Sequence, residues 1–170
     1  MNSNEILTFT RRITESNRSE LIVVLYDIFF AYANEAIECL EEIECLGKKC
    51  DEARIASERG RIALKKAGLS IEHLKGALDY KYELSSQLYP LYDYAERMAA
   101  KSIYTERVDG IKEAMRILSS LREAFVEVAK QDTSAPLMQN TEKVSAGYTY
   151  GRYDINEVTS NYDNARGFFA

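Results

Sequence analysis

The chain has 170 residues, of which 46 % are hydrophobic, and its formal net charge is −5. This hydrophobic content is enough for a folded core, so disorder of the whole chain is excluded. The acidic balance argues against a nucleic-acid partner, whose phosphates require a basic surface. No stretch approaches the ~20 apolar residues of a transmembrane helix, and residues 1–19 contain no apolar run of signal length. We therefore expect a cytoplasmic protein that does not insert into a membrane.

Residues 1–16 are expected to form a flexible N-terminal segment. The first predicted helix starts near Asn17, whose side chain can accept a hydrogen bond from a free backbone amide. Its apolar residues recur at steps of three and four, which is typical of a bundle helix. The helix is expected to stop near Gly47, since glycine is favoured just past a helix end. The apolar positions are Ile22, Leu25, Phe29, Tyr32 and Ala36.

The second predicted helix runs from about Asp51 to Leu78. Its inner face carries small residues in the first half and large ones in the second half. A glycine in a helix interior costs roughly 1 kcal/mol relative to alanine, so we expect a bend or a break, with Gly68 as the favoured place. The inner face consists of Ala53, Ala56, Gly60, Leu64, Ala67, Ile71, Leu74 and Leu78.

The third predicted helix covers about Tyr82 to Ser102, and Pro90 inside it predicts a kink. The fourth begins near Thr105, a candidate cap, and its pattern fades around residues 130–132. Four helices with short links predict an all-α, antiparallel up-and-down four-helix bundle, which leaves room for an additional short helix. The two apolar seams are Leu84, Leu88, Leu91, Ala95 and Met98, then Ile111, Ala114, Leu118, Leu121, Phe125 and Val128.

The sequence therefore divides into the segment 1–16, a bundle domain over 17–132 and a C-terminal extension over 133–170. The extension is rich in Ser, Thr, Asn and Gly and has almost no aliphatic periodicity, so we expect a flexible tail. Its aromatic residues are unusual for a solvating tail. They leave open the alternative that the tail docks on its own bundle or on a partner. They are Tyr148, Tyr150, Tyr153, Tyr162, Phe168 and Phe169.

The sequence lacks the residue patterns of familiar active sites and metal sites. A di-iron site in a helical bundle needs two Glu-x-x-His pairs, whereas the chain has one histidine, His73, which we interpret as a surface residue. Cys39, Cys45 and Cys50 form no CxxC pair and are interpreted as reduced thiols. A glycine-rich phosphate loop is absent. We therefore expect a binding protein that uses no cofactor, no metal and no catalytic residue.

The tripeptide Leu-Tyr-Asp occurs twice, at residues 25–27 and 91–93. The apolar periodicity places each Leu on a seam, with the Tyr beside it. In one interpretation, Tyr and Asp form hydrogen bonds between helices, because half-buried polar groups need partners. In the other, they line a groove for a partner protein. The two interpretations are compatible with each other.

Three sequence blocks resemble the flagellin export chaperones, the FliS family. The first block is residues 17–27, with the spacing of a helix cap, then Glu-Leu, then Leu-Tyr-Asp. The second runs from Lys66 to Tyr94 and holds the second Leu-Tyr-Asp. The third runs from Leu118 to Phe125, where the family usually ends in Trp. All three blocks lie in the family's order between about Thr14 and Phe125.

Several positions depart from the family pattern. Asn17 and Arg18 stand where the family usually has Ser-Pro, and Ile28 stands where it usually has Gly. The N-terminal segment of the family often carries tyrosines that cover the groove, whereas here Phe9 is the aromatic residue of that segment. Pro90 in the third helix is also unusual.

The resemblance implies a chaperone that binds the C-terminal segment of flagellin in the cytoplasm, prevents early polymerisation and hands the subunit to the flagellar type III export apparatus. A client helix would insert apolar side chains between bundle helices. The alternative is a helical-bundle adaptor or regulator of flagellar assembly with a different protein client. The predicted client-binding residues are Ile71, Leu74, Leu88, Leu91, Tyr92, Ile117 and Leu118, and the reading that most of them are core residues stays open.

Overall fold

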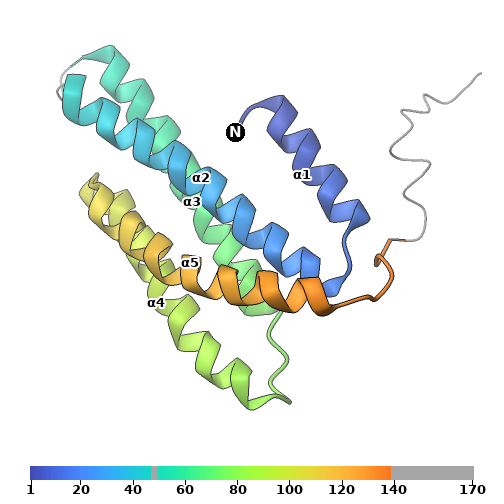
Figure 1. Cartoon of the computed structure of the whole chain (residues 1–170). Helices are drawn as coiled ribbons and strands as arrows, with labels where there is room; N and C mark the ends of the chain where they lie inside the picture. Colours follow the sequence, from blue (N-terminus) through green and yellow to red (C-terminus); the bar gives the residue numbers. More distant parts are fainter. Residues whose placement is uncertain (47–49, 139–170) are drawn as a thin grey trace, which may run out of the picture. The chain divides into compact units, whose positions relative to one another are not determined.

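The computed structural model describes residues 1–46 and 50–138, and within these ranges it consists of helices and their connections (Figure 1). No strand occurs among the described residues, so the all-α prediction is confirmed. The predicted tail lies outside the described residues from position 139 onward. The helices are α1 (Ser3–Glu15), α2 (Arg18–Leu46), α3 (Asp51–Gly76), α4 (Glu83–Thr105) and α5 (Val108–Gln131).

Helices α2 to α5 form the bundle, and successive helices run in opposite directions (Figure 1). Helix α2 packs on α3 and α5, and α4 packs on the same two helices. All four helices contribute apolar side chains to one core, because each has a stripe of residues removed from water. The larger residues of this core are Tyr26, Phe29, Leu40, Leu64, Ile71, Leu74, Leu88, Tyr92, Ile111 and Leu118.

Asn17 caps α2, as predicted. Its side-chain oxygen accepts a hydrogen bond from the Glu20 backbone N–H at 2.9 Å, and the Glu20 carboxylate accepts one from the Asn17 N–H at 2.9 Å. This reciprocal pair is a capping box. The Asn17 amide also donates to the Asp132 carbonyl at 3.1 Å, and the Ser19 hydroxyl donates to the Asp132 carboxylate at 2.5 Å. The start of α2 is therefore tied to the end of α5.

Helix α1 (Ser3–Glu15) lies within the segment 1–16, which we expected to be flexible. It begins with a second capping box, in which Asn2 and Glu5 exchange side-chain to backbone hydrogen bonds of 2.8 Å. Helix α1 packs against α2, and the Arg12 guanidinium donates to the Asp27 carboxylate of α2 at 2.6 Å. Helix α1 forms because its first turn is capped and because the ion pair between Arg12 and Asp27 holds it on α2. None of its side chains is fully buried.

Two further expectations about helix ends and continuity need correction. Thr105 does not cap α5, because it is the last residue of α4 and its hydroxyl donates to the Lys101 carbonyl at 2.9 Å. Glu106 then ends α4 in the left-handed region, with a φ of 51°. Helix α3 is continuous through Gly68, so no break occurs there.

Two other glycines let helices approach closely. A Cβ atom at Gly60 of α3 would lie 3.1 Å from the Cβ atom of Cys39 on α2. A Cβ atom at Gly110 of α5 would lie 2.4 Å from the Met98 carbonyl oxygen and 2.7 Å from the Ser102 hydroxyl on α4. Helices α4 and α5 therefore touch at the backbone level near their connection, and only glycine fits at this point.

Candidate functional site

The tyrosines of the two Leu-Tyr-Asp tripeptides meet in the core. The hydroxyl groups of Tyr26 on α2 and Tyr92 on α4 lie 2.6 Å apart, and both side chains are buried. Burial raises the pKa of both phenols, so the two groups stay neutral, one as donor and the other as acceptor. The ring of Phe125 on α5 lies 5.7 Å from that of Tyr26. The Tyr of each tripeptide is thus a core residue and the Leu lies beside it, the reverse of the predicted arrangement.

The aspartates of the same tripeptides hold neighbouring helices together. Asp27 accepts one bond of 2.6 Å from Arg12 on α1 and another of 2.6 Å from Arg122 on α5. Asp93 pairs with Arg97 at 3.1 Å and with Lys75 of α3 at 3.6 Å. The interpretation that these tripeptides form interactions between helices is confirmed. Their Tyr and Asp side chains are therefore engaged within the bundle.

The structure separates the predicted client-binding residues into two groups. Leu91 is 41 % exposed, and Ile117 is partly exposed. These two side chains present apolar surface to water, whereas the others pack inside the bundle. The residues that the structure buries in the core are Ile71, Leu74, Leu88, Tyr92 and Leu118.

Leu91 lies on the flank of α4 that is turned toward α5. The other flank carries Tyr89, whose ring lies 5.2 Å from the Lys75 ammonium of α3, and Asp93, which also pairs with Lys75. The buried residue Tyr92 lies between the two flanks. Residues three or seven apart share a side of a helix, so Leu84 and Tyr94 belong to the same flank as Leu91.

Ile117 lies on the matching flank of α5. The other flank carries Lys112 and Arg122, which form hydrogen bonds to acidic side chains of α2. Leu121 follows Ile117 by four residues, and Val128 follows Leu121 by seven, so both share its flank. We call the combined residues the α4–α5 apolar surface. It consists of Leu84, Leu91, Tyr94, Ile117, Leu121 and Val128.

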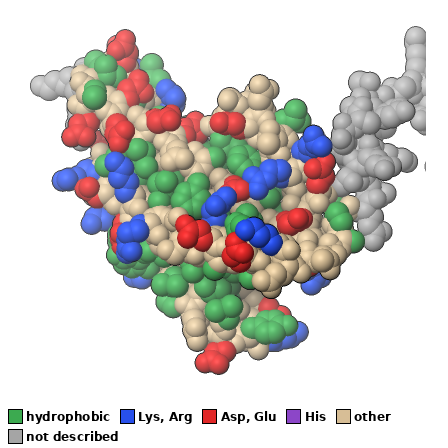
Figure 2. Space-filling view, viewed as in Figure 1, with side chains coloured by type: hydrophobic (Ala, Val, Ile, Leu, Met, Phe, Trp, Pro, Cys, Tyr) green, Lys and Arg blue, Asp and Glu red, His purple; other side chains and the backbone are tan. Residues whose placement is uncertain are grey.

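The α4–α5 apolar surface remains exposed because its two helices diverge. Figure 1 shows α4 and α5 meeting near their connection and separating toward Glu83 and Gln131. Leu84 and Val128, toward the separated ends, are both more than half exposed. In Figure 2, hydrophobic side chains gather below the band of charged residues on α5, over the region that α4 occupies in Figure 1. The bundle thus leaves apolar side chains between two helices in contact with water.

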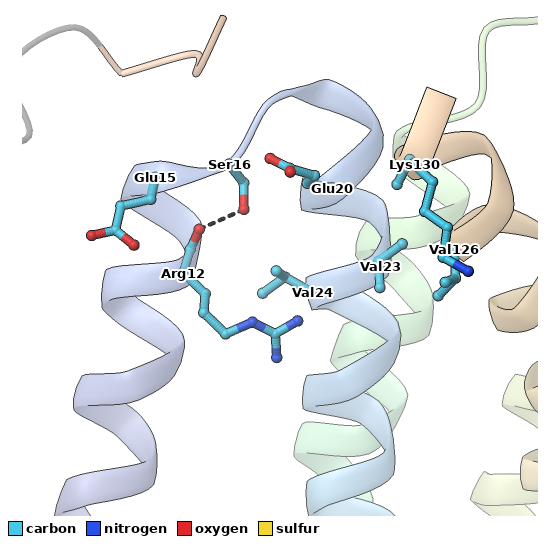
Figure 3. A pocket seen from close by; sticks show the side chains of 9 residues that line it. Arg12, Glu15, Ser16, Glu20, Val23, Val24, Val126 and Lys130 are labelled. Carbon is cyan, nitrogen blue, oxygen red and sulfur yellow. Dashed lines mark hydrogen bonds between the residues drawn. The ribbon is translucent and has the colours of Figure 1, made fainter. Parts of the chain in front are cut away.

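A separate recess lies between α1, the start of α2 and the end of α5 (Figure 3). Its volume is about 480 Å³. Its apolar lining is Val23, Val24, Val126 and Ala129, and its charged side chains are Arg12, Glu15, Glu20 and Lys130. Figure 3 shows Arg12 reaching from α1 toward α2 below this recess. None of the residues that line the recess was predicted as a site residue.

The family model for the flagellar protein FliS matches residues 6–132. The chain belongs to the FliS family. The match begins inside α1 and ends one residue after α5, so it covers both Leu-Tyr-Asp tripeptides and the whole α4–α5 apolar surface. Membership of this family implies a role as a flagellar export chaperone rather than as an enzyme. The search of curated proteins found no match.

Within residues 1–46 and 50–138, no group of three His, Cys, Asp or Glu side chains is placed to hold a metal ion. His73 is exposed on α3, as expected for a surface residue. Over the same ranges, every helix is too short or too polar to cross a membrane.

Proposed function

We propose that this FliS-family protein is a cytoplasmic export chaperone that binds the C-terminal helical segment of flagellin. Binding prevents premature polymerisation of that segment and aids flagellar type III secretion, with the export apparatus as a further partner. The observation that supports the proposal is the α4–α5 apolar surface, which is exposed and lies between two diverging helices.

The surface suits an amphipathic helix. Ile117, Leu121 and Val128 are spaced by four and seven residues, so they form one strip along α5, and Leu84 and Leu91 form a similar strip along α4. A client helix placed over the two strips would pack its apolar residues against both. Such binding uses no cofactor and no reactive group.

Burial of apolar surface supplies the driving force for such a complex. Full burial of an aliphatic side chain contributes about 1.5–3 kcal/mol, so burial of the exposed parts of these side chains contributes roughly 5–10 kcal/mol before costs. Client side chains contribute a similar amount. Ordering a disordered client segment costs about 2–5 kcal/mol or more, in addition to the cost of association.

The test is calorimetric titration of full-length variants with flagellin. Leu91→Glu and Val128→Glu each place a charge on the α4–α5 apolar surface, and we expect each to weaken binding by about tenfold or more. The matched control is Ile62→Glu on α3, because Ile62 is 44 % exposed and Leu91 is 41 % exposed. The control should bind like the unsubstituted protein. Helical circular dichroism should be the same for all variants.

Two results would contradict the placement of the site. One is unchanged affinity in both Leu91→Glu and Val128→Glu. The other is an equal loss in the Ile62→Glu control, which would mean that the added charge acts from a distance rather than at the surface. A failure of the unsubstituted protein to bind flagellin would favour the adaptor or regulator with another client.

A further inference from the structure

A second apolar strip runs along α3, on the side of the helix opposite its buried face. Ile55, Ile62 and Leu69 are 59 %, 44 % and 49 % exposed. They are spaced by seven residues, so they share one side of the helix and span about 21 Å at 1.5 Å per residue. We call these three residues the α3 outer strip. Such regular exposure of large aliphatic residues is costly in water.

The α3 outer strip faces neither helix on which α3 packs. The α2 side of α3 carries Lys66, whose ammonium lies 5.1 Å from the ring centre of Tyr32, and Arg59, which lies 3.9 Å from Glu42. The α4 side carries Lys75, which donates to Glu96 at 2.6 Å. The strip lies on the outer side between these two flanks. It is therefore separate from the core and from the α4–α5 apolar surface.

The charges around the strip are basic, although the chain is acidic. Residues 55–69 contain four bases, Arg59, Arg61, Lys65 and Lys66, and one acid, Glu58, so their net charge is 4 − 1 = +3 in a chain of net charge −5. Arg61 and Glu58 pair with each other at 2.7 Å. Arg59 pairs with Glu42 of α2 at 3.9 Å, so Lys65 and Lys66, one on each side of the strip, give it a basic border.

We propose that the α3 outer strip is a second protein-binding surface, whose partner is an amphipathic helix with aliphatic residues at heptad spacing and acidic flanks. The apolar strip supplies burial, and the basic border selects an acidic partner because unlike charges across an interface attract. A second copy of α3 is disfavoured, since two basic borders would repel. A lipid surface is also disfavoured, because the strip has three aliphatic residues and no aromatic residue to enter the interface. The proposal goes beyond flagellin binding and does not depend on it.

The probe is a synthetic helical peptide with leucine at every seventh position over three heptads, glutamate at the positions that flank each leucine, and alanine elsewhere. Fluorescence anisotropy of the labelled peptide is measured while the full-length protein is added. We expect saturable binding that weakens as salt rises, because charge attraction is screened. A peptide with lysine in place of glutamate should not bind.

Variants locate the binding surface. Ile62→Glu should weaken peptide binding by about tenfold or more, and so should the double change Lys65→Glu and Lys66→Glu. The control is Leu91→Glu on α4, which should bind the peptide normally. The pair Ile62→Glu and Leu91→Glu therefore separates the two surfaces, because each should lose one partner and keep the other.

Three outcomes would overturn the proposal. The acidic peptide does not bind the unsubstituted protein, or it binds Ile62→Glu with equal affinity. In the third outcome, vesicles of phosphatidylcholine and phosphatidylserine at a ratio of 3:1 bind the protein while the peptide does not, and Ile62→Glu abolishes that binding. The strip would then be a lipid-binding surface. Far-ultraviolet circular dichroism of Ile62→Glu should match the unsubstituted protein, since the side chain is 44 % exposed.

Discussion

The buried pair of tyrosines gives the sharpest stability prediction. Tyr92→Phe removes one hydroxyl group and leaves that of Tyr26 in the core, where its hydrogen-bond partner was the lost group at 2.6 Å. An unsatisfied buried hydroxyl costs about 1–3 kcal/mol of unfolding free energy. Tyr26→Phe should cost a similar amount for the same reason. The double variant removes both polar groups and keeps the shape, so it should be nearly as stable as the unsubstituted protein.

Urea unfolding followed by circular dichroism measures the four free energies of this cycle. The coupling energy between the two hydroxyl groups should be about 2–6 kcal/mol in magnitude, because each single variant loses about 1–3 kcal/mol and the double variant loses almost nothing. In thermal unfolding, each single variant should melt about 3–5 °C lower for each kcal/mol lost in a domain of this size. Tyr94→Phe is the control. Tyr94 is exposed on α4, so its change should stay within about 0.5 kcal/mol.

The result that would refute this reasoning is additivity. If the double variant loses the sum of the two single losses, the hydroxyl groups do not interact in the folded protein. A loss in Tyr94→Phe equal to that in Tyr92→Phe would also contradict it, because burial would then have no role.

Three further predictions concern helix contacts and charges. Gly110→Ala should lower the free energy of unfolding in urea by about 1–3 kcal/mol, because the added Cβ atom would lie 2.4 Å from a carbonyl oxygen. Gly68→Ala should raise that free energy by up to about 1 kcal/mol, because no atom lies within 4 Å of its added Cβ atom. Hydrogen bonds from Ser19 and then Ser134 lower the pKa of Asp132 from 3.8 to about 2. Because the pKa of Asp132 is lower in the folded protein, the ionised carboxylate adds to the free energy of unfolding above pH 3.8, and this contribution is lost as the pH falls through 2. In Asp132→Asn, the free energy of unfolding should therefore change less with pH in this acidic range. Asp27→Asn should weaken the hydrogen bonds that join α1 and α5 to α2. Limited proteolysis should then cleave α1 faster than in the unsubstituted protein. An unchanged cleavage rate would mean that other contacts hold α1 on α2.

The bundle helices could be predicted from the sequence because their signals are local. The apolar residues of α2 to α5 recur at helical spacing, and the Asn17 cap needs only the Glu three residues later. Helix α1 had comparable signals, namely the Asn2 and Glu5 capping box and the spacing of Ile6, Phe9 and Ile13. A helix of 13 residues is marginal in water by itself, so the formation of α1 depends on its contacts with α2, which the local sequence does not show.

The buried face of α4 could not be predicted in the same way. The apolar pattern selected Leu84 and Leu91 for the seam, whereas the buried set includes the polar residues Ser85, Tyr92 and Ser102. The choice depends on distant partners. Tyr92 is satisfied by Tyr26, and the Ser102 hydroxyl accepts a hydrogen bond from the Ile111 N–H at 2.9 Å. A pattern of hydrophobicity cannot show that a polar group will find such a partner.

The difference between the predicted seam of α4 and its buried face also changes which predicted site residues are exposed. Leu88 and Tyr92 were predicted to contact the client but lie in the core, while Leu84, Tyr94 and Val128, which were not predicted as site residues, are exposed. The useful signal was present in the seam of α5, because Ile117 lies one step outside it. Side chains at the edge of a seam, on a helix whose neighbour diverges, are the ones left exposed to water.

We propose that this protein binds the C-terminal helical segment of flagellin through its α4–α5 apolar surface. Calorimetric titration with flagellin from the same source, intact and lacking the C-terminal helical segment, tests this proposal most directly. We expect saturable binding of intact flagellin, with a negative heat-capacity change from apolar burial, and no binding of the truncated form. Equal binding of both forms, or binding of neither, would contradict it.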